Sequence, residues 1–373
     1  MKVIFDCTSL ANWTGHPTGI QRVVSEIGGE LLQLLSNVRL GLFQADGTCS
    51  EYDLKLRSAS GNIPIEAGDV VVTAGSNWDF SEHHHMLLGL REHGVKLGIL
   101  FYDVIPSVLP FSYGPGFSEI YKNWLIEAVA NCDVAFAISE NTKRDLNDFA
   151  AEQGLELPPV QVVRLGDDVP SAGGLPTADI IQKTSEPYLL TVGSIEYRKN
   201  HIMLLNAWRY MIEDQNYLPP KLYIVGRKGW LDNDIEYQIE NDIRLKGRIE
   251  VLKGLQDADL CLLYEKTLFT LYPSFYEGWG LPVAESLCFG KPCIASRSSS
   301  MLEIAPGLVR HAHPLLLNEW VEQIRLLVDN PAELRSECER VKNTYKRSSW
   351  RDTALQVREG LLASYPGLME NDA

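Results

Sequence analysis

Short apolar runs and amphipathic segments alternate along almost the whole chain. An apolar run of roughly four to eight residues between turn residues is typical of a buried strand, whereas apolar positions three and four apart are typical of a helix. Strands that alternate with helices form βαβ units around parallel sheets. The pattern therefore predicts an α/β fold.

In the first half we expect six strands and three main helices. The strands cover residues 2–8, 39–44, 69–74, 96–103, 134–139 and 160–165. The helices cover residues 20–35, 117–130 and 140–151. After Gly166 the sequence is rich in turn residues and has little apolar periodicity, which predicts a linker that runs to about Pro187.

A second series of strands and helices follows this linker. The strands cover residues 188–192, 221–225, 249–252, 268–272 and 292–295. The helices cover residues 201–212, 234–245, 257–266, 282–289 and 317–327, and residues 331–364 are rich in helical pattern. A length of 373 residues also favours two domains over one. We expect an N-terminal domain at 1–170, a C-terminal domain at 187–345, and a helix at 346–373 that packs back on the first.

The charge balance argues against a nucleic-acid partner. The formal net charge is −15, and nucleic-acid binders normally carry the opposite sign. The first 173 residues are the more acidic part, with 22 acidic and 11 basic residues. Hydrophobic residues make up 45% of the chain, so a sizeable core can form.

The cysteines and the hydropathy pattern both favour a cytoplasmic protein. The seven cysteines are scattered and form no CxxC pair, which fits small buried residues in a reducing compartment. The chain shows no secretion signal and no apolar run of about 18 residues. We therefore expect neither export nor a membrane span.

The most informative segment follows the strand at 268–272. It places the glycine-rich loop Glu277-Gly278-Trp279-Gly280 before a helix that opens near Pro282. Free N–H groups at a helix start, next to a glycine backbone, suit a diphosphate. Glu277 and Glu285 add carboxylates that accept hydrogen bonds from sugar hydroxyls, although two acids at this spacing are also common on a surface.

The sequence of this segment strongly resembles the donor-site segment of family 4 glycosyltransferases. It reads YPSFYEGWGLPVAESLCFGKPCIAS over residues 272–296. Stretches at 192–201, 224–230 and 298–304 are similar to the family in the same order. The resemblance implies a retaining enzyme of the GT-B fold, in which two Rossmann-like doubly wound domains face a central cleft.

The resemblance also implies roles for single residues. Arg198 and Lys199 would contact the donor diphosphate, Glu277 the transferred sugar and Glu285 the ribose hydroxyls. We expect the first three to be catalytic, because two cations after a strand can neutralise a departing diphosphate. Read alone, Arg198 and Lys199 are equally compatible with a solvated basic pair.

Backbone contacts to the donor are implied as well. The loop that would lie against the phosphate is formed by Gly278, Trp279, Gly280 and Leu281. Gly254, within residues 252–255, would lie at the nucleobase. In the first half, Gly19 belongs to the stretch Pro17-Thr18-Gly19, which resembles the family's glycine loop that faces the donor.

The acceptor side resembles the family less closely. Residues 101–106 occupy the stretch where members often have His-Asp, and here Tyr102 replaces the histidine before Asp103. Asp103 is the leading acceptor-side residue, which would orient the incoming hydroxyl or help with its proton. An equally simple alternative is that it caps a turn. Ser139 is an ordinary helix N-cap in sequence terms.

No metal site is expected. His83, His84 and His85 are adjacent, and adjacent residues on a helix point in different directions. The pair Asp257 and Asp259 mimics a metal-binding DxD but precedes a helical run, where it is interpreted as an N-cap. The stretch 114–116 lacks the strand and helix of a dinucleotide-binding fingerprint, which disfavours a nicotinamide enzyme.

The sequence therefore favours a glycosyltransferase that uses a nucleotide diphosphate sugar and no other cofactor. The resemblance to mannosyl- and rhamnosyl-transferring members favours a GDP- or dTDP-linked hexose or deoxyhexose and a role in bacterial surface polysaccharide, such as O-antigen or capsule. A glycan or lipid-linked glycan is the expected acceptor, and a lipid-linked one could bring the chain to the membrane surface. The alternatives are a retaining glycoside hydrolase using Glu277 and Glu285, and a non-catalytic sugar-binding protein.

Overall fold

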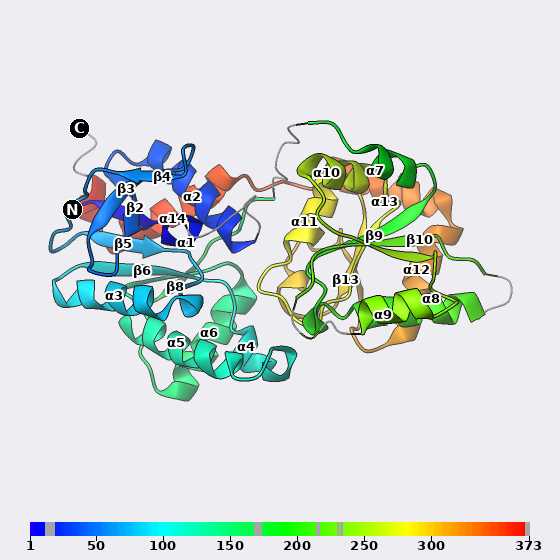
Figure 1. Cartoon of the computed structure of the whole chain (residues 1–373), viewed down its shortest axis with the longest axis horizontal. Coiled ribbons are helices and arrows are strands. Elements are labelled where there is room, and N and C mark those ends of the chain that lie inside the picture. The colour runs from blue at the N-terminus through cyan, green and yellow to red at the C-terminus, as the bar shows by residue number, and fades with distance from the viewer. Residues whose placement is uncertain (12–18, 168–173, 214–216, 230, 232–233, 370–373) are drawn as a thin grey trace. The chain divides into compact units, whose positions relative to one another are not determined.

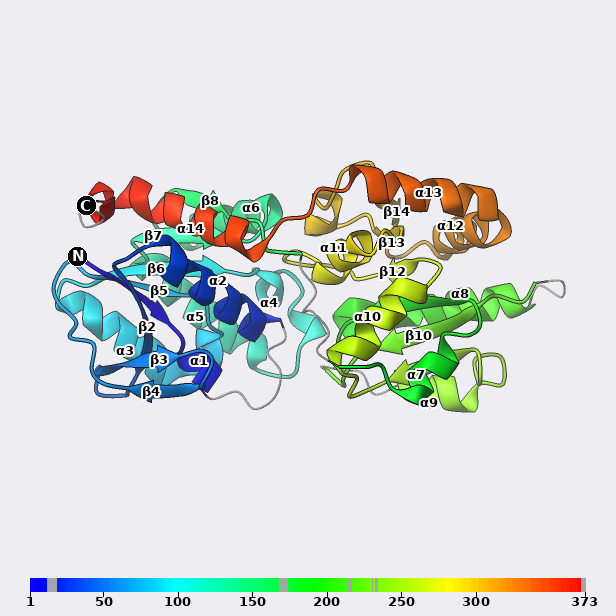
Figure 2. The same ribbon diagram turned by 90° about the horizontal axis from the view of Figure 1, so that it is seen from above.

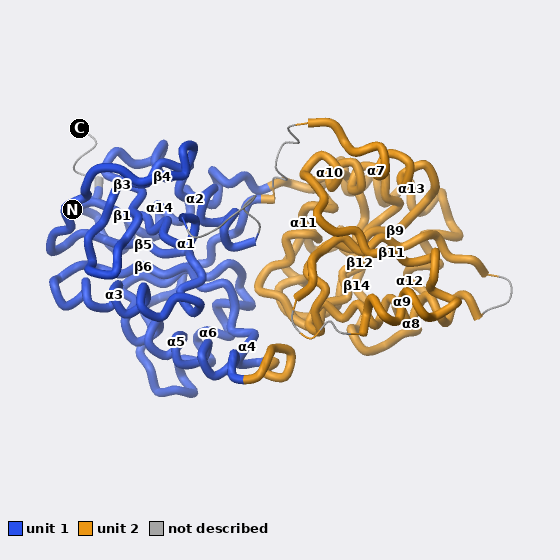
Figure 3. The backbone as a smooth tube through the Cα atoms, in the orientation of Figure 1, with its two compact units in different colours: residues 1–108, 116–166, 348–373 blue, residues 109–115, 167–347 orange. Residues whose placement is uncertain are grey.

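A computed structural model of the chain describes residues 1–11, 19–167, 174–213, 217–229, 231 and 234–369. They form two compact units (Figures 1 and 3). Unit 1 holds residues 1–108, 116–166 and 348–373, and unit 2 holds residues 109–115 and 167–347. Pro17, Thr18, Trp230 and residues 168–173 of the expected linker lie outside the described residues.

Unit 1 is built on an eight-stranded sheet in the order β4-β3-β2-β1-β5-β6-β7-β8. The strands are β1 (Val3–Asp6), β2 (Val38–Phe43), β3 (Cys49–Asp53), β4 (Ser58–Ser60), β5 (Val70–Thr73), β6 (Lys96–Phe101), β7 (Val134–Ala137) and β8 (Val160–Val162). The sequence analysis missed β3 and β4, which are antiparallel edge strands. Their residues are mostly polar and partly exposed, so they lack the apolar run that marks the parallel strands.

Helices cover both faces of this sheet (Figures 1 and 2). They are α1 (Thr8–Ala11), α2 (Ile20–Leu34), α3 (Ser81–Glu92), α4 (Ile105–Val108), α5 (Phe117–Asn131), α6 (Glu140–Gln153) and α14 (Trp350–Ser364). The core of one face joins strand residues such as Ile4 to α3, α5 and α6. On the other face α2 packs against α14, and glycines of these helices touch Phe5 and Phe136. The C-terminal helix thus completes unit 1.

Unit 2 has a six-stranded parallel sheet in the order β11-β10-β9-β12-β13-β14. The strands are β9 (Tyr188–Val192), β10 (Lys221–Val225), β11 (Ile249–Leu252), β12 (Thr270–Tyr272), β13 (Cys293–Ser296) and β14 (Arg310–Ala312). The helices are α7 (Ala178–Lys183), α8 (His201–Glu213), α9 (Ile235–Asn241), α10 (Asp257–Lys266), α11 (Leu281–Cys288), α12 (Leu317–Asp329) and α13 (Pro331–Thr344). The core against α8 and α12 includes Trp208 and Trp320, and the core against α7 and α10 includes Tyr188 and Tyr264. A sheet buried on both faces explains the near-continuous apolar strands.

Unit 2 differs from the sequence analysis in several details, and one of them is the edge strand β14, which was not expected. The expected linker contains α7, whose Ile180 is 1% exposed, so part of this stretch belongs to the core. Gln256, and not Asp257, is the N-cap of α10. Asp259 lies inside α10 and accepts hydrogen bonds from the backbone N–H of Thr177 (2.7 Å) and from its hydroxyl (3.0 Å), so its carboxylate anchors α7.

A helix must be long and apolar along its length to cross a lipid bilayer. Within the described ranges, none is both long and apolar enough to cross a membrane.

Candidate functional site

In unit 2 two loops meet where the strand order reverses. The chain runs from β9 to β10 and β11 on one side, and β12, β13 and β14 lie on the other side of β9. Ligands of open parallel sheets bind at such a point, at the carboxyl ends of the strands. The loop after β9 and the loop after β12 are joined here by a hydrogen bond from the N–H of Phe275 to the carbonyl of Arg198 (2.8 Å).

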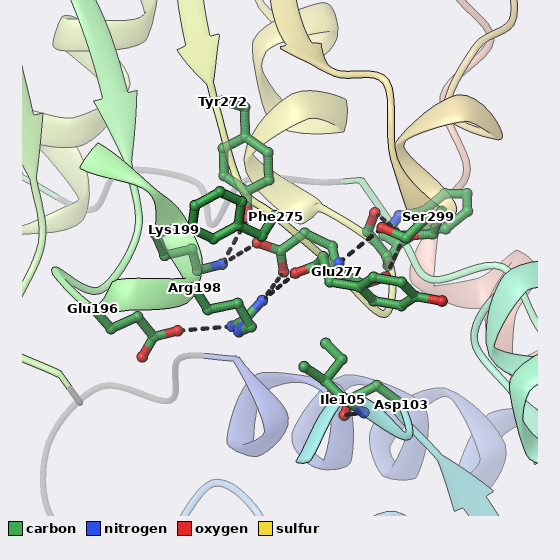
Figure 4. A network of polar contacts seen from close by, with 12 residues as sticks. Asp103, Ile105, Glu196, Arg198, Lys199, Tyr272, Phe275, Glu277 and Ser299 are labelled. Atoms are coloured by element: carbon green, nitrogen blue, oxygen red, sulfur yellow. Dashed lines mark hydrogen bonds and ion pairs between the residues drawn. The ribbon is translucent and has the colours of Figure 1, made fainter. Parts of the chain in front are cut away.

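Five polar side chains from these loops form one network, which we name the switch-point cluster (Figure 4). Its members are Glu196, Arg198, Lys199, Tyr272 and Glu277. Arg198 donates to Glu277 Oε2 at 2.7 Å and to Glu196 Oε1 at 2.8 Å. Lys199 donates to Glu277 Oε1 at 2.7 Å and to the hydroxyl of Tyr272 at 2.8 Å. One carboxylate, Glu277, therefore holds both cations.

Burial makes these charges depend on one another. The side chains of Glu277, Lys199 and Arg198 are 8%, 12% and 14% exposed. Burial by itself would raise the pKa of Glu277, but the charges of Arg198 and Lys199 outweigh it and lower the pKa to about 2. Glu277 is thus a carboxylate at neutral pH. The carboxylate of Glu277 therefore compensates the charge of both cations.

The local backbone explains how Lys199 and Arg198 reach Glu277. Residues 197–199 form a single 3₁₀ turn after β9, and Asn200 closes it with a φ of 54°. Asparagine tolerates this left-handed conformation better than most residues. The Asn200 side chain donates to the carbonyls of Pro273 (3.1 Å) and Pro314 (2.9 Å), which fixes the turn against the loop after β12.

The loop after β12 ends at the start of α11. Gly280 precedes the helix with a φ of 115°, and a Cβ there would lie 3.1 Å from Ile304. Only glycine adopts this conformation without strain. The Ser300 hydroxyl lies 2.8 Å from the carbonyls of both Glu277 and Trp279 as a shared donor. The segment after β13 therefore stabilises the loop after β12. The helix begins at Leu281, one residue before the expected Pro282.

Glu285 lies one turn into α11 and is 7% exposed. Its Oε2 accepts a hydrogen bond from the hydroxyl of Tyr264 at 2.9 Å. The ring of Tyr264 stacks on Phe289 with an interplanar angle of 9°, which restrains the tyrosine. Tyr264 therefore fixes the orientation of the Glu285 carboxylate.

Two glycines mark the remaining donor-side loops. A Cβ at Gly226, after β10, would lie 1.9 Å from the carbonyl oxygen of Gly193, after β9, so these loops touch backbone to backbone. Gly254, after β11, has a φ of 66° and open space around its Cα. The surroundings of Gly254 are compatible with the expected nucleobase contact, which stays a prediction.

The predicted residues of the first half lie in unit 1. Gly19 precedes α2 with a φ of 55°. Asp103 Oδ1 accepts a hydrogen bond from the N–H of Ile105 at 2.9 Å and so caps the turn before α4 (Figure 4). Tyr102 is buried and donates its hydroxyl to the carbonyl of Ala74 at 2.7 Å. The capping interpretation of Asp103 is therefore observed, and its acceptor-side role stays a prediction.

The sequence analysis predicted Arg198, Lys199 and Glu277, and the structure brings these three into contact. It missed Glu196, Tyr272 and Tyr264. Tyr272 is the last residue of β12, and Glu196 lies in the loop after β9. A position at the carboxyl end of a strand was therefore an available signal for both residues. Tyr264 had none, because it looks like a core residue of an amphipathic helix.

The described part of the chain contains no group of three or more histidine, cysteine, aspartate or glutamate side chains arranged to hold a metal ion. His84 and His85 both face Glu127, at 3.3 and 3.4 Å.

Comparisons with known proteins agree on this region. Residues 178–347 match the family model described as "Glycosyl transferases group 1". The chain is 26% identical over 331 residues to the serotype-specific mannosyltransferase WbdA of Escherichia coli, which covers 82% of this chain and 40% of that protein. It is 35% identical over 137 residues to O-antigen chain mannosyltransferase B of Escherichia coli, covering 36% and 35%. The chain thus spans about two fifths of the length of WbdA.

Solved structures are similar over nearly the whole chain. Sucrose-phosphate synthase of Thermosynechococcus elongatus matches with a TM-score of 0.70 and 16% identity, covering 98% of this chain and 100% of that one. Anabaena Alr3699/HepE, solved with UDP and glucose, matches with a TM-score of 0.68 and 14% identity, covering 97% and 100%. At these identities the likeness shows the fold alone. The predicted GT-B class of two Rossmann-like units is confirmed.

Proposed function

We propose that this chain, whose residues 178–347 match the family model of the group 1 glycosyl transferases, transfers a sugar from a nucleotide diphosphate donor to a glycan acceptor. The switch-point cluster carries this proposal. It places Arg198 and Lys199 beside Glu277 at the carboxyl ends of β9 and β12, where open parallel sheets bind their ligands.

The donor diphosphate would take over the two cations. Its oxygens replace the carboxylate oxygens of Glu277 as acceptors for Arg198 and Lys199, and the first turn of α11 adds N–H donors. Glu277 is then free to accept hydrogen bonds from hydroxyls of the transferred sugar. Glu285, oriented by Tyr264, accepts from the ribose hydroxyls. Stabilising the leaving diphosphate is the main contribution to the rate.

The transfer proceeds with retention of anomeric configuration. The bond between the sugar C1 and the diphosphate oxygen breaks, and the acceptor oxygen bonds to C1 on the same face. The hydroxyl proton of the acceptor passes to an oxygen of the leaving phosphate. Proton NMR of the first product reports the anomer, and a product of inverted configuration contradicts this step.

The sugar and its acceptor follow the curated relatives. Since these include mannosyltransferases, the donor is a GDP- or dTDP-linked sugar of mannose or rhamnose type. The acceptor is a growing glycan of a bacterial surface polysaccharide, free or lipid-linked. The reaction takes place in the cytoplasm, or at its membrane surface where the acceptor is lipid-linked, in line with the seven free thiols.

A glycoside hydrolase is the less favoured enzyme. Its general acid must be protonated at the working pH, and the pKa of Glu277 is lowered to about 2, which leaves Glu277 only the role of nucleophile in that scheme. Two cations bound to Glu277 also have no task in that scheme.

Thermal unfolding of the full chain with UDP, GDP, dTDP and CDP tests the donor site, because a ligand that binds only the native state raises the apparent stability. We expect one base to shift the unfolding temperature and Glu285→Ala to reduce the shift. Transfer is then measured with the matching nucleotide sugar. If none of the four nucleotides changes the unfolding temperature, the donor site is rejected. If a nucleotide stabilises the chain but no transfer is measured, the chain binds a sugar nucleotide without catalysing transfer.

A further inference from the structure

Unit 1 also reverses its strand order, at β1. The chain runs from β1 to β2 on one side, and β5, β6, β7 and β8 lie on the other side of β1. Asp6 is the last residue of β1, and it pairs in register with Thr73, the last residue of β5. A carboxylate thus stands at the point of unit 1 where open parallel sheets bind ligands.

Asp6 is 1% exposed. Within the described residues its carboxylate accepts hydrogen bonds from Thr8, Thr73 and His83. Its Oδ1 accepts from the N–H of Thr8 at 3.0 Å. Its Oδ2 accepts from the hydroxyl of Thr73 at 2.9 Å and lies 2.8 Å from Nε2 of His83. Asn77 donates to the Thr73 hydroxyl at 3.0 Å, so the hydroxyl hydrogen of Thr73 points at Asp6. The carboxylate is therefore ionised, and Nε2 of His83 carries a proton.

His83 comes from the first turn of α3, and its ring is held from two sides. Asp6 binds Nε2, and the ring of Phe43, the last residue of β2, lies 6.1 Å away between centroids. Burial by itself would lower the pKa of His83, but the charge of Asp6 and its hydrogen bond to the ring together outweigh burial and raise the pKa. An imidazole in one orientation and one tautomer is the arrangement that catalytic and binding sites use to present the other nitrogen.

That other nitrogen is available. Nδ1 of His83 has no hydrogen-bond partner in the described part of the chain, and it is not among the polar atoms sealed from solvent. The side chain as a whole is 12% exposed. His83 therefore leaves one ring nitrogen without a partner among the described residues, on a partly exposed side chain at the switch point of unit 1.

We infer that Nδ1 of His83 binds a hydroxyl group of the acceptor sugar, with Asp6 as the positioning residue that orients the ring. This inference rests on the proposed function and assigns to unit 1 a contact that the sequence analysis sought at Asp103. It also gives a purpose to one histidine of the 83–85 run, which has no part in the donor site.

The chemistry of Nδ1 favours a hydroxyl over an anion. Neutral imidazole with its proton on Nε2 accepts a hydrogen bond at Nδ1, and imidazolium donates one there. A hydroxyl can do both, so it fits either state, whereas a phosphate or carboxylate fits only the charged one. The excess of acidic residues in the first 173 positions also disfavours an anion.

Histidine-selective NMR of the full chain tests this contact directly. The probes are methyl α-D-mannopyranoside, methyl α-L-rhamnopyranoside and inorganic pyrophosphate, each titrated into protein with labelled histidine rings. The His83 signals are assigned by their loss in His83→Gln, with His83→Asn as the second choice if the first variant does not fold. We expect a saturable shift of the His83 signals with at least one glycoside. No response to either glycoside, or a response to pyrophosphate alone, overturns the inference.

Kinetics adds a readout that a purely structural histidine would not change. A Gln side chain can keep a hydrogen bond to Asp6 but places nothing at the position of Nδ1, so His83→Gln should raise the acceptor KM about 10-fold. The donor KM should stay unchanged. The matched control is His85→Gln, because His85 lies on the same helix, is 62% exposed and lies beside Glu127 and His84, away from Asp6. Equal acceptor KM values for His83→Gln and His85→Gln overturn the inference.

The role of Asp6 has its own readout. Asp6→Asn keeps the shape of the side chain and removes its charge, so it should lower the pKa of His83 in the same spectra and weaken the glycoside response. An unchanged response rejects Asp6 as a positioning residue.

The experiments distinguish a failure of the proposed function from a failure of the His83 contact. Stabilisation by a nucleotide with no His83 response leaves the glycosyltransferase assignment intact and removes the inference. A His83 response in a chain that no nucleotide stabilises removes the donor site and keeps sugar binding by unit 1.

Discussion

The two units have the same strand topology at the point where their order reverses, but they place different charges there. In unit 2, Glu277 is ion-paired with two cations, Arg198 and Lys199. In unit 1, Asp6 is paired with His83, an imidazole whose pKa this carboxylate raises. Topology thus fixes where side chains from separate loops meet, and their ionisation decides which ligand they suit. A pair of cations suits a diphosphate, and an imidazole suits a hydroxyl.

Removing one of the two cations of unit 2 should give the largest effect. Lys199→Met keeps much of the side-chain volume and deletes the charge that faces Glu277, so we expect transfer to slow by roughly 10²- to 10³-fold. The nucleotide diphosphate should also bind more weakly, since one of its two cations is gone. Initial rates and a thermal-shift titration measure the two quantities.

Lys221→Met is the matched control for this change. Lys221 is the first residue of β10, at the amino end of the sheet, and it pairs with Glu186 at 3.0 Å. Its loss should leave both quantities unchanged. If both variants behaved alike, the switch-point cluster of unit 2 would have no special role.

Stability against pH should separate the two carboxylates. Glu277 has a pKa of about 2 in the folded state, against an ordinary value of 4.5. Its ionisation therefore stabilises the folded state fully above pH 4.5, and this stabilisation is lost as the pH falls toward 2. The contribution is about 3 kcal/mol. His83 has a raised pKa, so its contribution is complete below 6.5 and is lost as the pH rises through the raised value.

Thermal unfolding of the wild type, Glu277→Gln and His83→Gln over a range of pH checks both windows. The deficit of Glu277→Gln should shrink on the acid side, and the deficit of His83→Gln should shrink on the alkaline side. Two deficits that shrink in the same window contradict the contrast between the units.

A smaller effect should come from the residue that orients Glu285. Tyr264→Phe removes the hydroxyl that donates to Glu285 Oε2, so the carboxylate loses its fixed orientation and the nucleotide should bind roughly 5- to 10-fold more weakly. Tyr188→Phe is the control, because the hydroxyl of Tyr188 is also buried in the same core but donates to the carbonyl of Leu263 at 2.7 Å. Equal nucleotide affinities in the two variants contradict a positioning role for Tyr264.

The sequence predicted unit 2 better than unit 1, for a physical reason. Arg198, Lys199 and Glu277 each follow a strongly apolar strand, and parallel strands end at one edge of their sheet, so their meeting could be foreseen. Asp6 and His83 are 77 positions apart. Which of three adjacent histidines reaches Asp6 depends on the turn that joins β5 to α3, and no periodicity encodes that turn.

The sequence analysis also failed to predict elements that are polar or short. β3 and β4 lie at the edge of the sheet with little apolar surface, and α7 has six residues in a turn-rich stretch. Each is stabilised by its neighbours more than by its own pattern. Asp259 illustrates this, because its contact with Thr177 joins α10 to the start of α7 across 82 positions.

The smallest effect should come from Tyr102, which stands where the resembling family often has histidine. Its hydroxyl ties the end of β6 to the carbonyl of Ala74, just after β5, and its ring is buried. Tyr102→Phe should therefore cost about 1 kcal/mol of unfolding free energy, because one buried carbonyl loses its donor. The acceptor KM should not change, since a buried phenol fully used by the backbone has nothing left for a sugar. A rise in acceptor KM as large as that of His83→Gln would mean that the acceptor side of unit 1 lies at β6, and the contrast between the two switch points would lose its functional meaning.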